Sequence, residues 1–187
     1  DTVANMILDD YSTPMRPFML RFSAPLKDLC EGVFGWSAKN LGEWAYKEER
    51  LEKPLYRMDG SSIWNRREDL QYIGTQVFRT MDPEVWVKAA MRNANRVASQ
   101  HNCTGFISTD CRFPNELEAL QKHFGAVRVI RMVKEGGATT SLQADGTPHE
   151  SERYIGTFPV DAEYTVAAGD FDHLLRVAKF NREFFRG

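Results

Sequence analysis

Short apolar runs of strand length alternate with segments of helical periodicity, and this alternation restricts the fold more than any other feature. Thr104–Thr109 (TGFIST) is typical of a buried strand. Pro114 then begins a segment whose leucines recur on one side of a helix, and Gly125 ends it. Ala126–Val133 (AVRVIRMV) is a second strand-like run. Because helices that separate strands form right-handed crossovers, the pattern predicts an α/β fold, a parallel sheet in three layers.

The same alternation extends over the rest of the chain, and we expect one domain over residues 1–187. Residues 35–67 mix Trp and Tyr with charges, and Pro54 and Gly60 interrupt any long period, so this stretch is expected to be helical and loop. Residues 35–67 are the first part of an expected helical and aromatic insertion over about 35–100. Residues 134–150 are expected to form a lid-like loop. Helices are predicted over residues 1–11, 25–34, 67–80, 83–100, 114–124 and 171–185, and strands over 17–22, 104–109, 126–133 and 163–168.

Composition places the chain among globular proteins. Hydrophobic residues make up 42% and charged residues 27%, which excludes the disordered and fibrous classes. No apolar run approaches the roughly 20 residues of a membrane helix. The net charge of −2 gives no support for bulk-charge binding to nucleic acid or to a membrane.

Cysteine usage and the first residues predict the compartment. Cys30, Cys103 and Cys111 include no CxxC pair and no histidine at metal-ligand spacing, so three packing thiols in a reducing compartment are expected. The first ten residues carry no basic n-region of a signal peptide. The predicted location is cytoplasmic.

Polar side chains follow the ends of three predicted strands, where open α/β sheets bind their ligands. Lys27 lies one turn into the helix after the first strand, and Asp110 and Arg112 follow TGFIST. Arg131 closes the next strand and leads into the loop that contains His149. An arginine at such a position can hold a phosphate or a carboxylate through two parallel hydrogen bonds.

Each of these residues also has a purely structural interpretation. Asp110 and Arg112 can form an ion pair that caps the following helix, and Lys27 can be a solvated helix lysine. His149 can be an exposed loop residue. Trp86 fits a helical apolar stripe of the core, although an aromatic ring beside a pocket can also stack on a base.

Five segments together carry a resemblance to one family. They are DTVANMI at the start, RFSAPLKDLCEGVFGW, REDLQYIGTQVFR followed by Trp86, STDCRFPNELEAL, and VIRMV leading to HESE. In this order the chain resembles the phage-type deoxynucleoside monophosphate kinases, a branch of the P-loop kinases. The resemblance implies the three-layer parallel sheet of that fold, and a phage-encoded member would act in the host cytoplasm.

The same resemblance implies a strand and a glycine-rich phosphate loop before Asp1. In this family the loop ends in Gly-Lys and leads directly into the helix that begins Asp-Thr-Val-Ala. Its backbone N–H groups and its lysine hold the phosphates of ATP. We therefore expect the 187 residues to be a fragment of a longer protein.

For the reaction, the resemblance implies that the γ-phosphoryl group of ATP is transferred to a deoxynucleoside monophosphate, with Mg²⁺, to give the diphosphate. The residues implied fall into three groups. The catalytic residues are Asp110 and Arg112, which would face the reacting phosphates, and Arg131, which would close over ATP as a lid together with the loop to His149. Those binding the monophosphate are Lys27, Arg67, Gln71, Gly74, Thr75, Arg79, Trp86 and Glu116. Those near ATP are Asp1, Thr2 and His149, with Asp1 and Thr2 beside the metal.

A second interpretation is a non-catalytic nucleotide-binding or interaction protein derived from that fold. The sequence is compatible with more than one oligomeric state, a homodimer included. ATP and deoxynucleoside monophosphates are the expected partners, and neither nucleic acid nor a membrane is expected.

Overall fold

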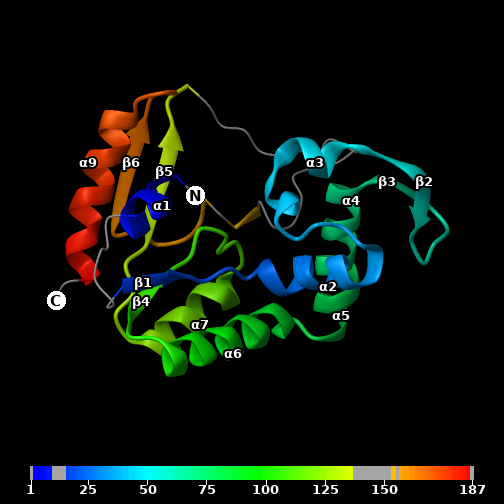
Figure 1. Cartoon of the computed structure of the whole chain (residues 1–187), viewed down its shortest axis with the longest axis horizontal. Helices are drawn as coiled ribbons and strands as arrows, with labels where there is room; N and C mark the ends of the chain where they lie inside the picture. The colour runs from blue at the N-terminus through cyan, green and yellow to red at the C-terminus, as the bar shows by residue number, and fades with distance from the viewer. Residues whose placement is uncertain (1, 10–15, 137–152, 155, 186–187) are drawn as a thin grey trace. The chain divides into compact units, whose positions relative to one another are not determined.

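The computed structural model describes residues 2–9, 16–136, 153–154 and 156–185, and it is a mixed α/β structure with short parallel sheets. The chain divides into two compact units (Figure 1). Unit 1 comprises residues 1–21 and 91–187, and unit 2 comprises residues 22–90.

Unit 1 contains two parallel strand pairs. Strand β1 (Arg16–Met19) pairs with β4 (Cys103–Ile107), and β5 (Ile130–Lys134) pairs with β6 (Ala162–Val166). The parallel strands expected from the sequence are therefore confirmed. The predicted strand over 126–133 was wrong at its start, because the ladder with β6 begins only at residue 130.

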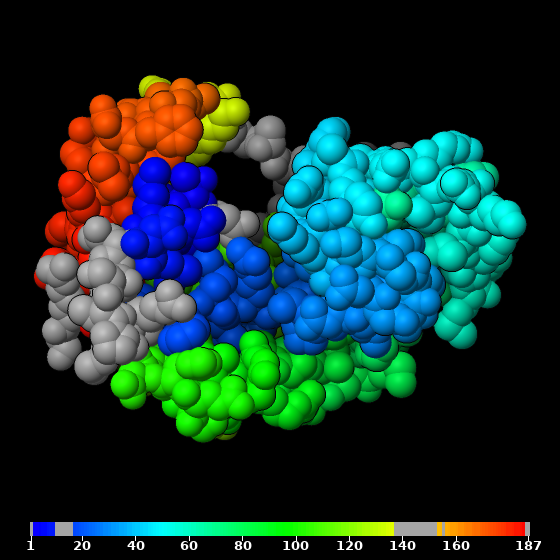
Figure 2. Space-filling view, viewed as in Figure 1, coloured from blue at the N-terminus to red at the C-terminus, as the bar shows by residue number. Residues whose placement is uncertain are grey.

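The helices of unit 1 pack beside these strands. Helix α9 (Phe171–Arg182) lies along β6, and α1 (Thr2–Asp9) packs against α9 (Figures 1 and 2). Ala4 and Ile7 of α1 are buried. A short 3₁₀ turn, η3 (Glu183–Phe185), follows α9 and places the Phe185 ring against β4, 3.0 Å from where a Cβ on Gly105 would lie. The predicted helices over 1–11 and 171–185 are confirmed, apart from residues outside the described ranges.

Helix α7 (Pro114–Phe124) follows β4 and begins and ends where the sequence predicts. Pro114 occupies the first turn, where a missing N–H has no cost. Gly125 ends the helix with a φ of 72°, a conformation that residues with a Cβ rarely adopt. His123 near the end of α7 lies 2.9 Å from Asn95 of α6 (Val85–Gln100), whose first residues belong to unit 2.

Unit 2 is built around a small core next to α2 (Ala24–Phe34). Leu26 and Cys30 lie one turn apart on this helix and are buried together with Trp36, Leu41 and Trp86. The short helices η1 (Asn40–Gly42) and α3 (Trp44–Glu48) follow. The chain's four tryptophans all lie between residues 36 and 86, inside unit 2.

The predicted helix over 67–80 is confirmed and contains an unusual turn. It consists of α4 (Arg66–Gln71), the π-helical η2 (Tyr72–Val77) and α5 (Phe78–Met81). Asn65 caps its start by accepting a hydrogen bond from the backbone N–H of Glu68 at 2.9 Å. π-helical turns are rare and occur often at functional sites.

The expectation of helix and loop over 35–67 was wrong for part of this stretch, which forms an antiparallel hairpin. Strand β2 (Arg50–Tyr56) pairs with β3 (Ser62–Asn65). Pro54 cannot donate to the ladder, and the register shifts between Arg50 and Leu55 around it. The turn signal was present in the sequence as Asp59-Gly60-Ser61, where Gly60 adopts a φ of 83°.

The cysteines and the lengths of the helices bear on two expectations from composition. Cys30, Cys103 and Cys111 are free thiols, as expected. Across the described ranges, every helix is too short or too polar to cross a lipid bilayer.

Candidate functional site

The best-defined polar site in unit 1 is the loop that leaves the carboxyl end of β4. It carries Asp110 and Arg112, both half-buried, and ends where Pro114 begins α7. Because β1 and β4 are parallel and the backbone N–H of Leu20 donates to the Ile107 carbonyl at 2.9 Å, Arg21 leaves β1 at the same end of the pair. Arg21, Asp110 and Arg112 therefore all follow strands at the same end of the β1–β4 pair.

Glu116 holds this loop from inside. Its side chain is 2% exposed, and its Oε2 accepts hydrogen bonds from the backbone N–H of Arg112 at 2.7 Å and of Phe113 at 3.1 Å. The carboxylate thus satisfies donors at the start of α7, as a capping box does. These contacts identify Glu116 as a group that fixes the backbone on which Arg112 is carried, a role that the sequence interpretation did not assign to it.

The same loop contains a thiol in an acidic environment. Burial, with the nearby charges of Glu116 and Asp110, raises the pKa of Cys111 to about 12. A thiol with this pKa stays protonated at neutral pH, and the thiolate is the nucleophilic form. The raised pKa of Cys111 therefore argues against an activated nucleophile at this position.

Arg131, predicted to close over ATP with the lid-like loop, contacts β6 and the segment before it in the described part of the chain. Its guanidinium forms an ion pair with Glu163 at 2.9 Å, directly across the β5–β6 ladder. It also donates to the carbonyls of Gly156 at 3.2 Å and Phe158 at 3.0 Å. These bonds tie β5 to β6 and to the segment before β6, and they do not connect Arg131 to Asp110 or Arg112.

Seven of the predicted substrate residues lie in unit 2. One lies on α2, and the other six follow the helical stretch from α4 to the start of α6. The seven are Lys27 on α2, Arg67 and Gln71 on α4, Gly74 and Thr75 on η2, Arg79 on α5 and Trp86 on α6.

Two of these seven are packing residues of the unit 2 core. Trp86 is 6% exposed, its ring packs against Phe78, and its indole N–H donates to the Gly74 carbonyl at 2.8 Å. A Cβ on Gly74 would lie 2.8 Å from a methyl carbon of Leu26, so η2 and α2 approach each other closely at this glycine. This favours the core interpretation of Trp86 over base stacking.

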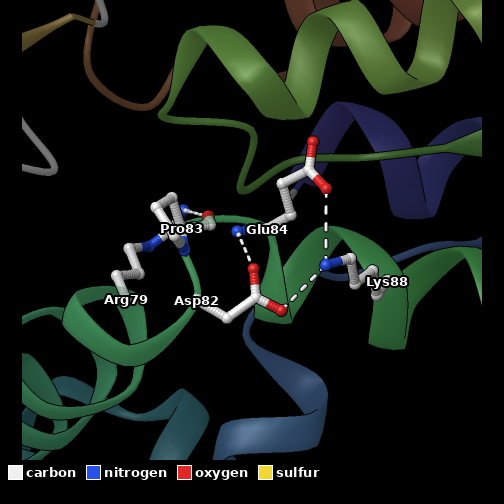
Figure 3. Close-up of polar contacts among 5 residues, drawn as sticks. All are labelled: Arg79, Asp82, Pro83, Glu84 and Lys88. Carbon is white, nitrogen blue, oxygen red and sulfur yellow. Dashed lines mark hydrogen bonds and ion pairs between the residues drawn. The ribbon is translucent and has the colours of Figure 1, made fainter.

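The two arginines predicted to bind the monophosphate, Arg67 and Arg79, are held by neighbours. Arg67 forms an ion pair with Glu48 of α3. Arg79 donates to the Pro83 carbonyl at 3.3 Å, next to a network in which Lys88 contacts Asp82 at 2.9 Å and Glu84 at 3.4 Å (Figure 3). Figure 3 shows this network at the α5–α6 junction, where the Asp82 carboxylate also accepts from the Glu84 backbone.

Asp69 is a candidate functional residue that the sequence interpretation missed. It lies on α4, it is 3% exposed, and its Oδ2 has no hydrogen-bond partner among the described residues. Burial raises its pKa from 3.8 to about 6, against the opposing influence of the Arg57 charge. The available signal was helical spacing, because Ile73 and Val77 follow Asp69 at intervals of four residues, which places a carboxylate on an apolar face.

The residues assigned to ATP and magnesium are only partly described. Asp1 and His149 lie outside the described residues, as does most of the lid-like loop over 134–150. Thr2 is the exposed first residue of α1. Within the described ranges, His, Cys, Asp and Glu side chains do not gather in groups of three or more that could hold a metal ion.

The chain was compared with known proteins in three ways. A scan against models of protein families, a search of curated proteins and a search of solved structures each found no match.

Proposed function

We propose that the protein is a deoxynucleoside monophosphate kinase, which transfers the γ-phosphoryl group of ATP to a deoxynucleoside monophosphate. The observation that carries the proposal is the loop after β4, where Asp110 and Arg112 lie at the carboxyl end of a parallel strand on a backbone fixed by Glu116. This is the edge of an α/β sheet at which ligands bind. The loop also contains the DCRFPNE segment on which the family resemblance rests.

The chemistry of such a transfer suits these residues. An oxygen of the acceptor's 5′-phosphate attacks the γ-phosphorus, the bond from that phosphorus to the β–γ bridging oxygen breaks, and ADP leaves. The enzyme's task is to position the groups and neutralise charge, so it needs no nucleophile of its own. In the proposal the Arg112 guanidinium binds phosphate oxygens, and the half-buried Asp110 carboxylate orients the groups around it.

The pairing of the strands in unit 1 supports the proposed fold. Parallel strands are normally part of larger sheets covered on both faces, yet the described strands of unit 1 form two separate two-stranded parallel pairs. The two pairs supply the parallel strands that the proposed α/β fold requires.

The magnesium ion is part of the proposal through ATP. Mg²⁺ bound with ATP would neutralise charge on the phosphates during transfer. The described residues do not supply a cluster of ligands for it, and the exposed Thr2 hydroxyl is a single donor. The roles proposed for Asp110, Arg112 and Glu116 do not depend on a protein ligand to the metal.

A coupled assay of ADP formation on the full-length protein tests the proposal. The assay uses ATP and Mg²⁺ with each of the four deoxynucleoside monophosphates in turn. The proposal expects ADP release that requires a monophosphate acceptor and gives the matching diphosphate. Nucleotide binding without transfer to any acceptor would support the non-catalytic alternative instead.

A further inference from the structure

A contact between two aromatic rings joins the loop after β4 to a residue that precedes β6. The ring centroids of Phe113 and Tyr154 lie 6.1 Å apart, and the rings are tilted by 48°. Aromatic pairs attract each other at such separations and inclinations. Both residues are half-buried, and both belong to unit 1. Because Phe113 directly follows Arg112, the contact supports the residue next to the candidate catalytic guanidinium.

The backbone of Tyr154 is held in turn by Thr157. The backbone N–H of Thr157 donates to the Tyr154 carbonyl at 2.9 Å, and the Thr157 hydroxyl donates to the same oxygen at 2.8 Å. A carbonyl oxygen has two lone pairs, so these two bonds use its full capacity. The ring of Tyr154 is therefore carried by a backbone that is fastened to the residues after it.

Arg131 fastens the neighbours of Thr157 to the sheet. Its guanidinium donates to the carbonyls of Gly156 at 3.2 Å and Phe158 at 3.0 Å, and it pairs with Glu163 at 2.9 Å across the β5–β6 ladder. The donors of a guanidinium point in fixed directions within one plane, so a single arginine can hold several acceptors in a defined arrangement. Arg131 thus ties both sides of Thr157 to β5, and through Thr157 the tie extends to the ring contact.

Two supports of different kinds meet at Phe113. Its backbone N–H donates to the buried carboxylate of Glu116 at 3.1 Å, and its ring packs against Tyr154. The backbone N–H of Arg112 donates to the same carboxylate oxygen at 2.7 Å. A shift of the Phe113 ring therefore strains the peptide groups that carry these donors. Misplacing a catalytic group by about 1 Å can lower a rate about a hundredfold, so supports of this kind affect turnover.

We propose that Tyr154 and Arg131 are positioning residues that hold the loop after β4 through the Phe113 ring. The place of the Arg112 guanidinium at the carboxyl end of β4 depends on this support. The inference deepens the proposed function and rests on it for the effect on phosphoryl transfer. Tyr154 acts through its ring, so Tyr154→Phe should preserve the support and Tyr154→Ala should remove it.

Alkylation of Cys111 measures the support without an enzyme assay. Cys111 is a half-buried thiol of the loop, next to Arg112, and Cys103 is a half-buried thiol of β4 that serves as the internal reference. The full-length proteins are treated with iodoacetamide, and alkylation at each cysteine is quantified by peptide mass spectrometry. A protected thiol reacts during local openings, so its rate reports how firmly its own segment is held.

Tyr154→Ala should raise the alkylation rate of Cys111 about threefold or more and that of Cys103 by less than about 1.5-fold. Arg131→Ala should change the two rates in the same way, because it releases the backbone that carries Tyr154. Tyr154→Phe and the control Lys134→Ala, which changes an exposed lysine of β5, should leave both rates within about 1.5-fold of the wild type. Where Tyr154→Ala does not fold, Tyr154→Leu also removes the ring and is expected to have the same effect.

The kinetics of the full-length protein separate positioning from packing. Tyr154→Ala should lower kcat for ADP formation about tenfold or more and change the KM for the monophosphate less than about threefold. Tyr154→Phe should restore kcat. A contact that serves stability alone would lower the melting temperature and leave kcat unchanged at temperatures where the variant is folded.

Failure of the inference is distinguishable from failure of the proposed function. Equal Cys111 rates in the wild type and Tyr154→Ala, equal increases at Cys111 and Cys103, or a Tyr154→Phe variant as impaired as Tyr154→Ala would overturn the inference. Selective exposure of Cys111 in Tyr154→Ala, in a protein that transfers no phosphoryl group, would refute the kinase and leave the support of the loop standing. Phosphoryl transfer by Tyr154→Ala at the wild-type rate would refute the positioning role alone.

Discussion

The Glu116 carboxylate accepts a hydrogen bond from the backbone N–H of Arg112 at 2.7 Å, and this bond links the first turn of α7 to the loop after β4. The residue with the candidate catalytic guanidinium is therefore positioned by a buried side chain four residues further along. Arg112→Ala removes the guanidinium but keeps the backbone N–H of this bond, whereas Glu116→Ala removes the acceptor of the bond and keeps the guanidinium.

Glu116→Ala should lower the free energy of unfolding by about 1–3 kcal/mol, because it leaves two backbone donors unsatisfied. Glu116→Gln should cost less, because one amide oxygen can take the place of Oε2, which accepts both bonds. Urea unfolding followed by circular dichroism measures the difference. Glu118→Gln, an exposed change on the same helix, is the control and should have little effect. Equal stability of Glu116→Ala and the control would show that the two bonds do not support the loop.

Asp69 should make the stability of unit 2 depend on pH with a definite sign. Its pKa is raised from 3.8 to about 6, so between these values the native state binds more protons than the unfolded state. The contribution of Asp69 to the free energy of unfolding is therefore largest below about pH 4. It falls by at most about 3 kcal/mol as the pH rises to about 6. Asp69→Asn should lack this slope and should unfold at a higher urea concentration than the wild type at pH 7.5.

Tryptophan fluorescence is suited to this measurement, because all four tryptophans lie in unit 2. The quantity to compare is the difference in unfolding free energy between wild type and Asp69→Asn at pH 4.5 and at pH 7.5. A difference that does not change with pH would contradict the raised pKa of Asp69.

Gly74→Ala should destabilise unit 2 by about 1–3 kcal/mol, because overpacking forces neighbouring atoms to move. The added Cβ would lie 2.8 Å from a methyl carbon of Leu26, at the close approach of η2 and α2. Gly32→Ala is the matched control: it lies on α2 with no atom within 4 Å of its added Cβ, and it should stabilise the unit by up to about 1 kcal/mol. Urea midpoints from tryptophan fluorescence should therefore shift in opposite directions. A shared direction would show that the Gly74–Leu26 approach is not tight.

Local signals were sufficient to predict much of unit 1. Pro114 and Gly125 mark the ends of α7 because a proline suits the first turn and a glycine suits the left-handed residue after the last. The apolar runs that became β4 and β5 were long enough to be recognised as strands. How these strands group into two pairs depends on contacts between distant segments, and the periodicity of each run carries no information on that.

The sequence was less informative where a residue occupies an environment that its type usually avoids, such as a proline in a strand or a carboxylate in a core. Strand β2 carries charges and Pro54, so its alternation is weak, and only the Asp59-Gly60-Ser61 turn indicated the hairpin. Asp69 escaped notice because acidic residues are rarely fully buried. The ion pair of Arg131 could not be read from local spacing, because its cross-strand partner Glu163 is thirty-two residues away in the sequence.

The most direct test of the kinase proposal compares Arg112→Ala with Arg92→Ala, which removes an exposed arginine of α6. The measurement is kcat for ADP formation in the full-length protein, alongside the melting temperature of each variant. The proposal predicts that Arg112→Ala lowers kcat by about a hundredfold or more while its melting temperature stays within a few degrees of that of Arg92→Ala. A loss of stability that accounts for the loss of activity, or unchanged kcat, would contradict the role of Arg112 in phosphoryl transfer.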